Sequence, residues 1–134
     1  MHINGACHCG KITYEAEVDP EAVSICHCTD CQTLSGTAFR TTVRAKRGDF
    51  HLLTGEPKVY IKTAESGNKR AQAFCADCGT PLWATTPTVP LVYGLRVGAI
   101  RQRNELKPSR QIWARSAQGW LSELGSMPRV EKQA

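Results

Sequence analysis

The seven cysteines of this 134-residue chain lie in three short clusters, and none lies outside them. Because seven is an odd number, they cannot all pair as disulfides within the chain. Thiols grouped at such spacing are instead typical of metal sites, for which zinc is the usual ion. The sequence therefore predicts a zinc protein. The three clusters hold Cys7 and Cys9; Cys26, Cys28 and Cys31; and Cys75 and Cys78.

The first and third clusters are cysteine pairs that each end in glycine, as Cys-x-Cys-Gly and Cys-x-x-Cys-Gly. The tight turn within a pair aims two sulfurs at one point, and the glycine can take a positive φ while backbone amides turn toward the thiolates. Two such pairs make a closed tetrahedral set, which ties the N-terminal segment to the middle of the chain. The expected structural ligands are Cys7, Cys9, Cys75 and Cys78.

The central cluster places its three thiols, Cys26, Cys28 and Cys31, within one short segment. Three protein ligands leave a tetrahedral ion one open position, which is typical of a catalytic zinc that holds water or substrate there. Thr29 is the expected N-cap of a short helix whose N-terminal dipole helps to keep Cys31 ionised. We therefore expect two Zn²⁺ ions per chain, one structural and one catalytic.

Other assignments of the ligands remain open at this point. The second zinc can instead be a closed structural site that a histidine or an aspartate completes. His27 stands between two ligand positions, but the middle side chain of an extended Cys-x-Cys segment points away from the metal, so a loop histidine is its expected role. A different fold would let Cys7, Cys9, Cys26 and Cys28 share one metal.

Short strands dominate the predicted secondary structure, because β-branched runs of strand length alternate with turn signals along the chain. Helical character is confined to residues 29–35 and, more weakly, 116–124. No repeat or long linker divides the chain, so we expect one mainly β domain over residues 1–127 and a short polar tail over 128–134. The expected strands are 11–18, 39–44, 58–63, 70–74, 81–84 and 91–97.

Composition and charge exclude several classes of protein. No apolar run reaches the roughly 18 residues of a membrane span, and an apolar fraction of 41% is too high for a disordered chain. The net charge of +5 arises in residues 96–134, where basic residues are scattered rather than gathered into the stripe typical of nucleic-acid binders. We therefore expect neither a membrane nor a nucleic-acid partner. The N-terminus shows no secretory pattern, so we expect a cytoplasmic protein.

Three motifs surround the cysteine clusters, at residues 5–14 (GACHCGKITY), 26–36 (CHCTDCQTLSG) and 74–82 (FCADCGTPL). In this order they resemble the motifs of the glutathione-dependent formaldehyde-activating enzyme family, which also includes the centromere protein V-like proteins. The resemblance covers most of the chain and implies an Mss4-like (β-tent) fold, a zinc-stapled sandwich of short antiparallel sheets with little helix. It also implies the same partition of zinc ligands and the activity of a carbon–sulfur lyase. One departure is Gln32, which stands where these enzymes often carry arginine.

The resulting hypothesis is a zinc-dependent carbon–sulfur lyase that acts on a small thiol adduct similar to S-hydroxymethylglutathione. The thiol or thiohemiacetal would occupy the open position of the zinc in the central cluster. Nearby candidates for proton transfer are Asp30, His27 and Ser35. The expected partner is a small thiol, with glutathione as one candidate, and the residues leave the oligomeric state open. The alternative is a non-catalytic zinc-stabilised module that binds protein or RNA through a surface of the domain.

Overall fold

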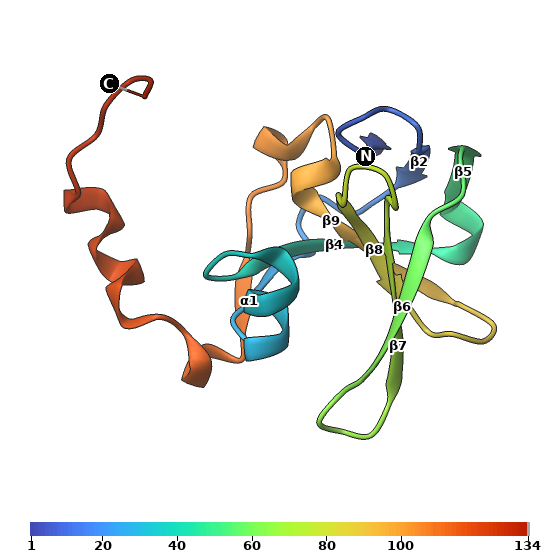
Figure 1. The fold of residues 1–134 in the computed structure, drawn as a ribbon. Helices are drawn as coiled ribbons and strands as arrows, with labels where there is room; N and C mark the ends of the chain where they lie inside the picture. The colour runs from blue at the N-terminus through green and yellow to red at the C-terminus, as the bar shows by residue number, and fades with distance from the viewer. Residues whose placement is uncertain (134) are drawn as a thin grey trace.

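Ten strands form two sheets in the computed structural model, which describes residues 1–133 (Figure 1). The smaller sheet has the order β1 (His2–Ala6), β2 (Thr13–Glu17) and β5 (Phe50–Thr54). The larger sheet runs, in spatial order, through β10 (Arg110–Ile112), β3 (Val23–Cys26), β4 (Arg40–Lys46), β9 (Val92–Arg96), β8 (Pro81–Thr85), β7 (Lys69–Phe74) and β6 (Lys58–Thr63). The strand pairs are antiparallel except β10 with β3, which is parallel. The predicted mainly β fold is therefore confirmed.

Helical structure is scarce, as the sequence predicts. The α-helix α1 (Thr29–Ser35) has the predicted bounds, whereas the weakly predicted helix near the C-terminus is a 3-10 helix, η5 (Gly119–Ser126). Shorter 3-10 turns are η1 (Arg47–Asp49), η2 (Val97–Ala99), η3 (Arg103–Glu105) and η4 (Ala114–Ser116). No helix among residues 1–133 has the length and apolar character needed to cross a bilayer.

The apolar core lies between the two sheets, because strand alternation turns one face of each sheet toward the other. Val43 of β4 and Tyr14 of β2 are almost fully buried in it. The Tyr14 ring lies 5.5 Å from Trp83 of β8 in an edge-on arrangement, which joins the sheets. A Cβ added at Gly5 would come within 2.0 Å of the Tyr14 ring, so this position of β1 accepts only glycine without rearrangement.

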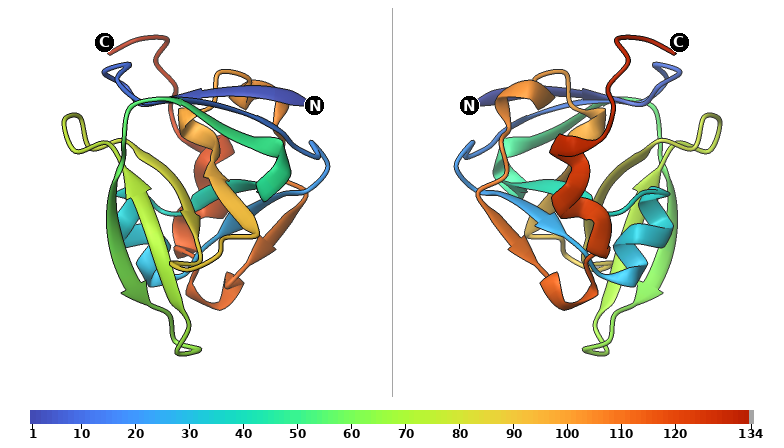
Figure 2. Two further views of the ribbon diagram at one scale, coloured as in Figure 1. Left: turned by 90° about the vertical axis from the view of Figure 1, so that its right-hand side faces the viewer. Right: turned by 90° about the vertical axis from the view of Figure 1, so that its left-hand side faces the viewer.

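The helix α1 lies beside the other face of the larger sheet (Figures 1 and 2), which is polar along β4. Along β4, Arg40, Thr42 and Arg44 alternate with the core residues Val43 and Ala45. The helix approaches the far edge of the same sheet through an ion pair of 2.8 Å that joins its first turn to β6. We call this polar surface the outer face of the larger sheet.

The segment after β10 runs along the outside of the molecule in 3-10 turns and ends away from the sheets (Figure 1). Its side chains are mostly exposed, and residues 127–133 lie outside any helix or strand. The predicted tail, 128–134, ends at a residue outside the described range, and its boundary with the domain stays a prediction.

Candidate metal centres and the adjoining cavity

The four cysteines expected to form a structural site are brought together from two distant loops. The Sγ atoms of this four-cysteine cluster all lie within 4.8 Å of one another. Neighbouring sulfurs are 3.6 Å apart for Cys7 and Cys9 and 3.7 Å apart for Cys9 and Cys75. A tetrahedral zinc with Zn–S bonds of about 2.3 Å needs sulfurs about 3.8 Å apart, so the donor set fits this ion. The cluster members are Cys7, Cys9, Cys75 and Cys78.

Local backbone geometry shapes both loops for this convergence. Gly10 and Gly79, which close the two cysteine pairs, have φ values of 82° and 77°, as the sequence predicts. The backbone N–H of Ile12 donates to Cys7 Sγ at 3.2 Å. The hydroxyl of Thr80, 3.2 Å from Cys78 Sγ, together with backbone N–H groups lowers the pKa of the Cys78 thiol to about 5. These contacts favour thiolates, which are the form that binds a metal.

The two loops are also joined to each other outside the thiols. Lys11 of the first loop forms an exposed ion pair with Asp77 of the second. The backbone N–H of His8 donates to Thr80 Oγ1 at 3.0 Å across the same junction. The contacts hold the N-terminal segment beside the β7–β8 connection, so convergence of the sulfurs does not depend on the thiols alone.

The central cysteines form a second, separate group whose three Sγ atoms lie within 4.8 Å of one another. Cys26 ends β3, and Cys31 lies in the first turn of α1. Cys28 is the N-cap, because its Sγ accepts a hydrogen bond from the backbone N–H of Cys31 at 3.3 Å. The prediction of Thr29 as the N-cap is thus wrong by one residue, because the Cys28 sulfur caps the helix. We call Cys26, Cys28 and Cys31 the three-cysteine cluster.

The thiols of this cluster differ in their electrostatic surroundings. Burial raises the pKa of Cys31 to about 12, and neighbouring thiols add to the effect. Burial also acts to raise the pKa of Cys28, but hydrogen bonds from the Cys31 N–H and the adjacent thiols, helped by the charge of Lys62, lower it overall. Without a metal the cluster therefore favours a thiolate at the helix N-cap first, and a bound cation would be needed to hold all three as thiolates.

Two residues considered as a fourth ligand are engaged elsewhere. His27 is buried, and its Nε2 is 2.7 Å from Gln111 Oε1 of β10. Asp30 points outward to Lys62 of β6, at 2.8 Å. Among the described histidine, cysteine, aspartate and glutamate side chains, the central group therefore gathers its three cysteines alone. The alternative in which the first and central clusters share one metal does not match this grouping.

The remaining proton-transfer candidate, Ser35, lies at the C-terminal end of α1. Its hydroxyl donates to the carbonyl of Gln32 at 3.4 Å. Ser35 also lines a cavity of about 450 Å³, together with Phe39, Arg40 and Arg96. Of the three candidates for proton transfer, it is the one that faces this cavity.

Gln32 has a structural role within the same helix. Its side-chain amide donates to the carbonyls of His27 at 2.7 Å and of Ser116 at 3.0 Å. Its Oε1 accepts from the amide of Gln118 at 2.8 Å. These bonds attach the C-terminal segment to α1, and they occupy the side chain on both its donor and acceptor sides.

A second cavity, of about 390 Å³, lies between α1 and the outer face of the larger sheet, and sequence reasoning missed its polar lining. Arg40 of β4, Gln72 of β7 and Arg96 of β9 line it, with Leu34 of α1 opposite them. Burial and the neighbouring charge of Arg40 lower the pKa of Arg96 to about 9. The sequence places Arg40 in a predicted strand. That its side chain meets those of Gln72 on β7 and Arg96 on β9 follows only from the order of strands in the sheet.

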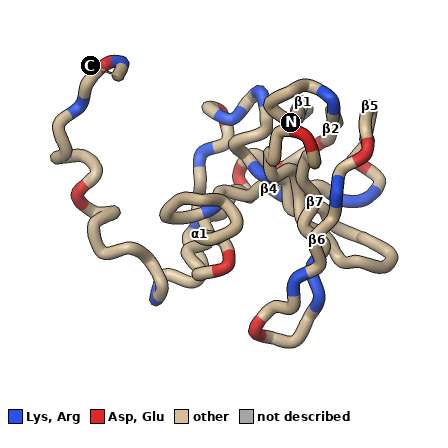
Figure 3. Tube along the Cα trace, in the orientation of Figure 1, with Lys and Arg blue, Asp and Glu red and all other residues tan. Residues whose placement is uncertain are grey.

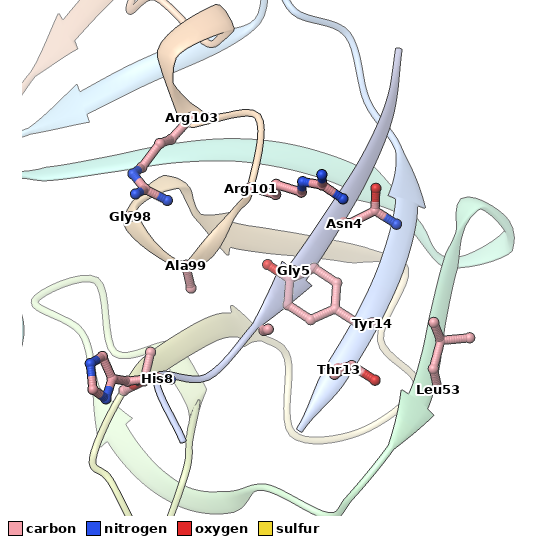
Figure 4. Close-up of a pocket in the computed structure, with 12 residues that line it drawn as sticks. Asn4, Gly5, His8, Thr13, Tyr14, Leu53, Gly98, Ala99, Arg101 and Arg103 are labelled. Atoms are coloured by element: carbon pink, nitrogen blue, oxygen red, sulfur yellow. Dashed lines mark hydrogen bonds between the residues drawn. The ribbon is translucent and has the colours of Figure 1, made fainter. Parts of the chain in front are cut away.

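A larger cavity, of about 860 Å³, lies on another part of the molecule (Figure 4). It is formed by β1, β2 and the turn at η2, and Arg101 and His8 stand on its rim. No cysteine lines it, nor does any cysteine line the cavities of about 390 and 450 Å³. Its residues are Asn4, Gly5, Ala6, His8, Thr13, Tyr14, Leu53, Thr80, Gly98, Ala99, Arg101 and Arg103.

Comparison with known proteins places this geometry in context. The sequence profile of one family, described as glutathione-dependent formaldehyde-activating enzyme, matches residues 2–116. A crystal structure of a Rhodobacter sphaeroides protein, a Northeast Structural Genomics target, is similar in fold, with a TM-score of 0.61. That protein is 19% identical in sequence, and the similarity covers 81% of this chain and 98% of the other. No curated protein shows significant similarity to the chain.

Proposed function

The chain belongs to the glutathione-dependent formaldehyde-activating enzyme family, whose fold is Mss4-like, and on that premise we propose that it is a zinc-dependent carbon–sulfur lyase. Its substrate is a small thiol adduct similar to S-hydroxymethylglutathione. The four-cysteine cluster holds a structural zinc, and the three-cysteine cluster holds the catalytic one. The protein works in the cytoplasm, where a reducing environment keeps both sets of thiols free to bind metal.

One observation carries this proposal: the three-cysteine cluster has no fourth ligand among the described side chains. A structural zinc site is closed by four protein ligands, whereas a catalytic site keeps one position for water or substrate. The two clusters of this chain differ in that respect. The first offers four sulfurs, and the second offers three.

The reaction requires modest chemistry. The sulfur of a thiol adds to the carbonyl carbon of formaldehyde, so that a C–S bond forms and the C=O π bond breaks. The carbonyl oxygen takes up the proton that the thiol loses and becomes a hydroxyl. Cleavage reverses these steps. A zinc ion held by three thiolates supplies weak Lewis acidity, which lowers the pKa of a thiol or hydroxyl in its fourth position. The protein supplies the position of the substrate and a route for the proton.

Of the three candidates for proton transfer, one lines a cavity and the other two have structural partners. Ser35 faces the cavity beside Arg40, so its hydroxyl can relay a proton to or from an adduct bound there. His27 is turned toward Gln111, and it orients the cysteine segment that contains it. Asp30 pairs with Lys62 at the outer side of α1, and it fixes the helix on the sheet. We therefore assign proton transfer to Ser35.

The test replaces zinc with Co²⁺ in the full chain and adds glutathione or a smaller thiol. A new thiolate on the ion produces sulfur-to-cobalt charge transfer, so we expect the spectrum to change at millimolar thiol or below. Cys31→Ser removes one ligand and should abolish the change, while Arg101→Gln, in the separate larger cavity, should leave it intact.

Turnover is measured by NMR exchange between formaldehyde, thiol and adduct, with a panel of thiols. Faster exchange that Cys31→Ser abolishes is the expected result. If no thiol alters the cobalt spectrum, and a protein group proves to be the fourth ligand, the lyase is excluded and a zinc-stabilised module that binds protein or RNA replaces it.

A further inference from the structure

A further cavity, of about 860 Å³, lies on the outer face of the larger sheet. It shares no lining residue with the three cavities described above, and none of its lining residues is a cysteine. Its volume is within the range of about 300–1,000 Å³ that is typical of small-molecule sites. Arg44 of β4, Arg70 of β7 and Trp113, which follows β10, all line it. We call it the Trp113 cavity.

The sheet keeps the floor of this cavity open. Arg44 pairs with Gly94 of β9, and Gly94 pairs with Ala84 of β8. Ala84 pairs in turn with Gln72 of β7, and Arg70 stands two positions along that strand, so its side chain projects to the same face. The two middle strands therefore carry only a glycine and an alanine between the two arginines.

The charges around the Trp113 cavity are positive and lack acidic partners. In the part of the chain that the structure describes, the ion pairs involve neither Arg44 nor Arg70. Burial and the charge of Arg44 lower the pKa of Arg70. Lys69 and Arg70 also line an adjoining cavity of about 460 Å³. Figure 3 shows basic positions on both arms of the β6–β7 hairpin, and the acidic residue of its turn, Glu65, lines neither cavity. Such a group of cations favours a ligand with more than one negative charge.

The remaining wall of the cavity is largely apolar and exposed. Val89 and Leu91, from the connection between β8 and β9, are both exposed, and Trp113 is 43% exposed. An indole that is open to solvent offers a stacking surface for a planar ring. The combination of an indole with guanidinium groups suits a ligand that has both an aromatic part and an anionic part.

Two strained backbone positions line the same cavity. Among residues 1–133, the non-glycine residues with positive φ are Val89, at 44°, and Trp113, at 55°. This conformation is unfavourable for β-branched and bulky residues, and it tends to be retained at ligand sites. Trp113 is fixed between β10 and η4, where the Ser116 N–H donates to the Trp113 carbonyl at 3.0 Å. The backbone on both sides therefore holds the indole at the cavity.

We propose that the Trp113 cavity binds a nucleoside phosphate, with the base against Trp113 and the phosphates on Arg44 and Arg70. Guanidinium groups donate paired hydrogen bonds to phosphate oxygens. A phosphate monoester carries about −1.5 to −2 charges at pH 7, so it balances two arginines, whereas one carboxylate does not. The site is separate from both cysteine clusters and does not depend on the lyase function proposed above.

The test is calorimetric titration of the zinc-loaded full chain with ADP, adenosine and inorganic pyrophosphate. ADP should bind about 10-fold or more tightly than either of the others, because it alone reaches both the indole and the guanidinium groups. Arg70→Gln should weaken ADP about 10- to 100-fold and leave adenosine unchanged. Trp113→Leu should weaken ADP and adenosine about 5- to 100-fold and leave pyrophosphate unchanged. A general loss of folded structure would affect all three probes.

Matched controls test whether the effects belong to the cavity. Trp120→Leu removes a tryptophan of the same exposed fraction, 43%, from η5, and Arg101→Gln removes an arginine from the cavity in Figure 4. Neither residue lines the Trp113 cavity, so each variant should change the affinity for ADP by less than about twofold. Cys28→Ser should bind ADP as the native protein does, because no cysteine lines the cavity.

Four results would overturn the proposal. The first is failure of the native protein to bind ADP at millimolar concentration, and the second is an equal loss of binding in Trp120→Leu or Arg101→Gln. The third is loss of ADP binding in Cys28→Ser, which would place the phosphates on the zinc. The fourth is a single-stranded oligonucleotide of about ten residues that binds about 100-fold more tightly than ADP through Arg70 and Trp113, which would assign the cavity to nucleic acid.

Discussion

Replacing Cys75 with serine should unfold the protein, whereas replacing Cys28 should leave it folded with one zinc. The reason is the length of chain that each metal closes. The four-cysteine cluster joins Cys7 to Cys75 and so closes a loop of about 70 residues, which corresponds to about 4 kcal/mol of loop-closure entropy. The three-cysteine cluster closes a loop of about six residues, which corresponds to about 2 kcal/mol.

The first value is comparable to the whole stability of a small domain, about 5–15 kcal/mol, before the zinc–sulfur bonds are counted. Removing Cys75 also leaves three thiols, of which Cys7 is buried, Cys78 half-buried and Cys9 exposed, around an incomplete site at the junction of the N-terminal loop with β7 and β8. Both clusters have contacts outside the thiols, since Lys11 pairs with Asp77 at the first and Asp30 pairs with Lys62 at the second. The three-cysteine cluster is less closely coupled to folding because the loop that it closes is much shorter.

The assay combines metal analysis with thermal unfolding followed by circular dichroism. Native protein should contain two zinc ions, and a chelator should remove one before the other. Cys28→Ser should keep the native spectrum with one zinc, while Cys75→Ser should be insoluble or unfolded. A soluble, fully folded Cys75→Ser protein that retains both metals would refute the assignment of that cysteine to a folding-coupled site.

Two further substitutions test local features of the fold and the site. Gln111→Leu removes the partner of buried His27 and should lower the free energy of unfolding by about 1–3 kcal/mol, while metal analysis still finds two zinc ions; loss of zinc would instead implicate His27 as a ligand. Gly5→Ala places a Cβ within 2.0 Å of the Tyr14 ring and should lower the free energy of unfolding by about 1–3 kcal/mol or more, as measured by thermal unfolding. Gly48→Ala, which meets nothing within 4 Å, is its control, and equal effects of the two would contradict the packing explanation.

Features that depend on neighbouring residues were predictable from the sequence. The bounds of α1, the positive φ of Gly10 and Gly79, and most strands follow from local backbone preferences. The grouping of cysteines was also predictable, because the two pairs that end in glycine match each other and the other three thiols share one short segment. The spacing of cysteines within each cluster indicates a metal site locally, even where two clusters from distant loops share the ion.

Four strands were missed because their formation depends on a partner strand. β10 is three residues long and pairs in parallel with β3, a contact between segments more than 80 residues apart. β3 has four residues, and β1 and β5 have five each. In addition, β5 lacks the alternation of buried and exposed residues that marks a half-buried strand. Strand propensity is weak for such segments, so pairing and burial decide their conformation.

The polar part of the site was decided by the tertiary structure. Arg40, Gln72 and Arg96 lie on three strands, and only the sheet order places them around one cavity. The sequence determined which residues could bind metal, because thiol spacing and glycine positions act over a few bonds. It did not determine which charges act on the thiols, such as those of Lys62 and Arg40. Those positions depend on strand order and register, which arise from packing of the whole core.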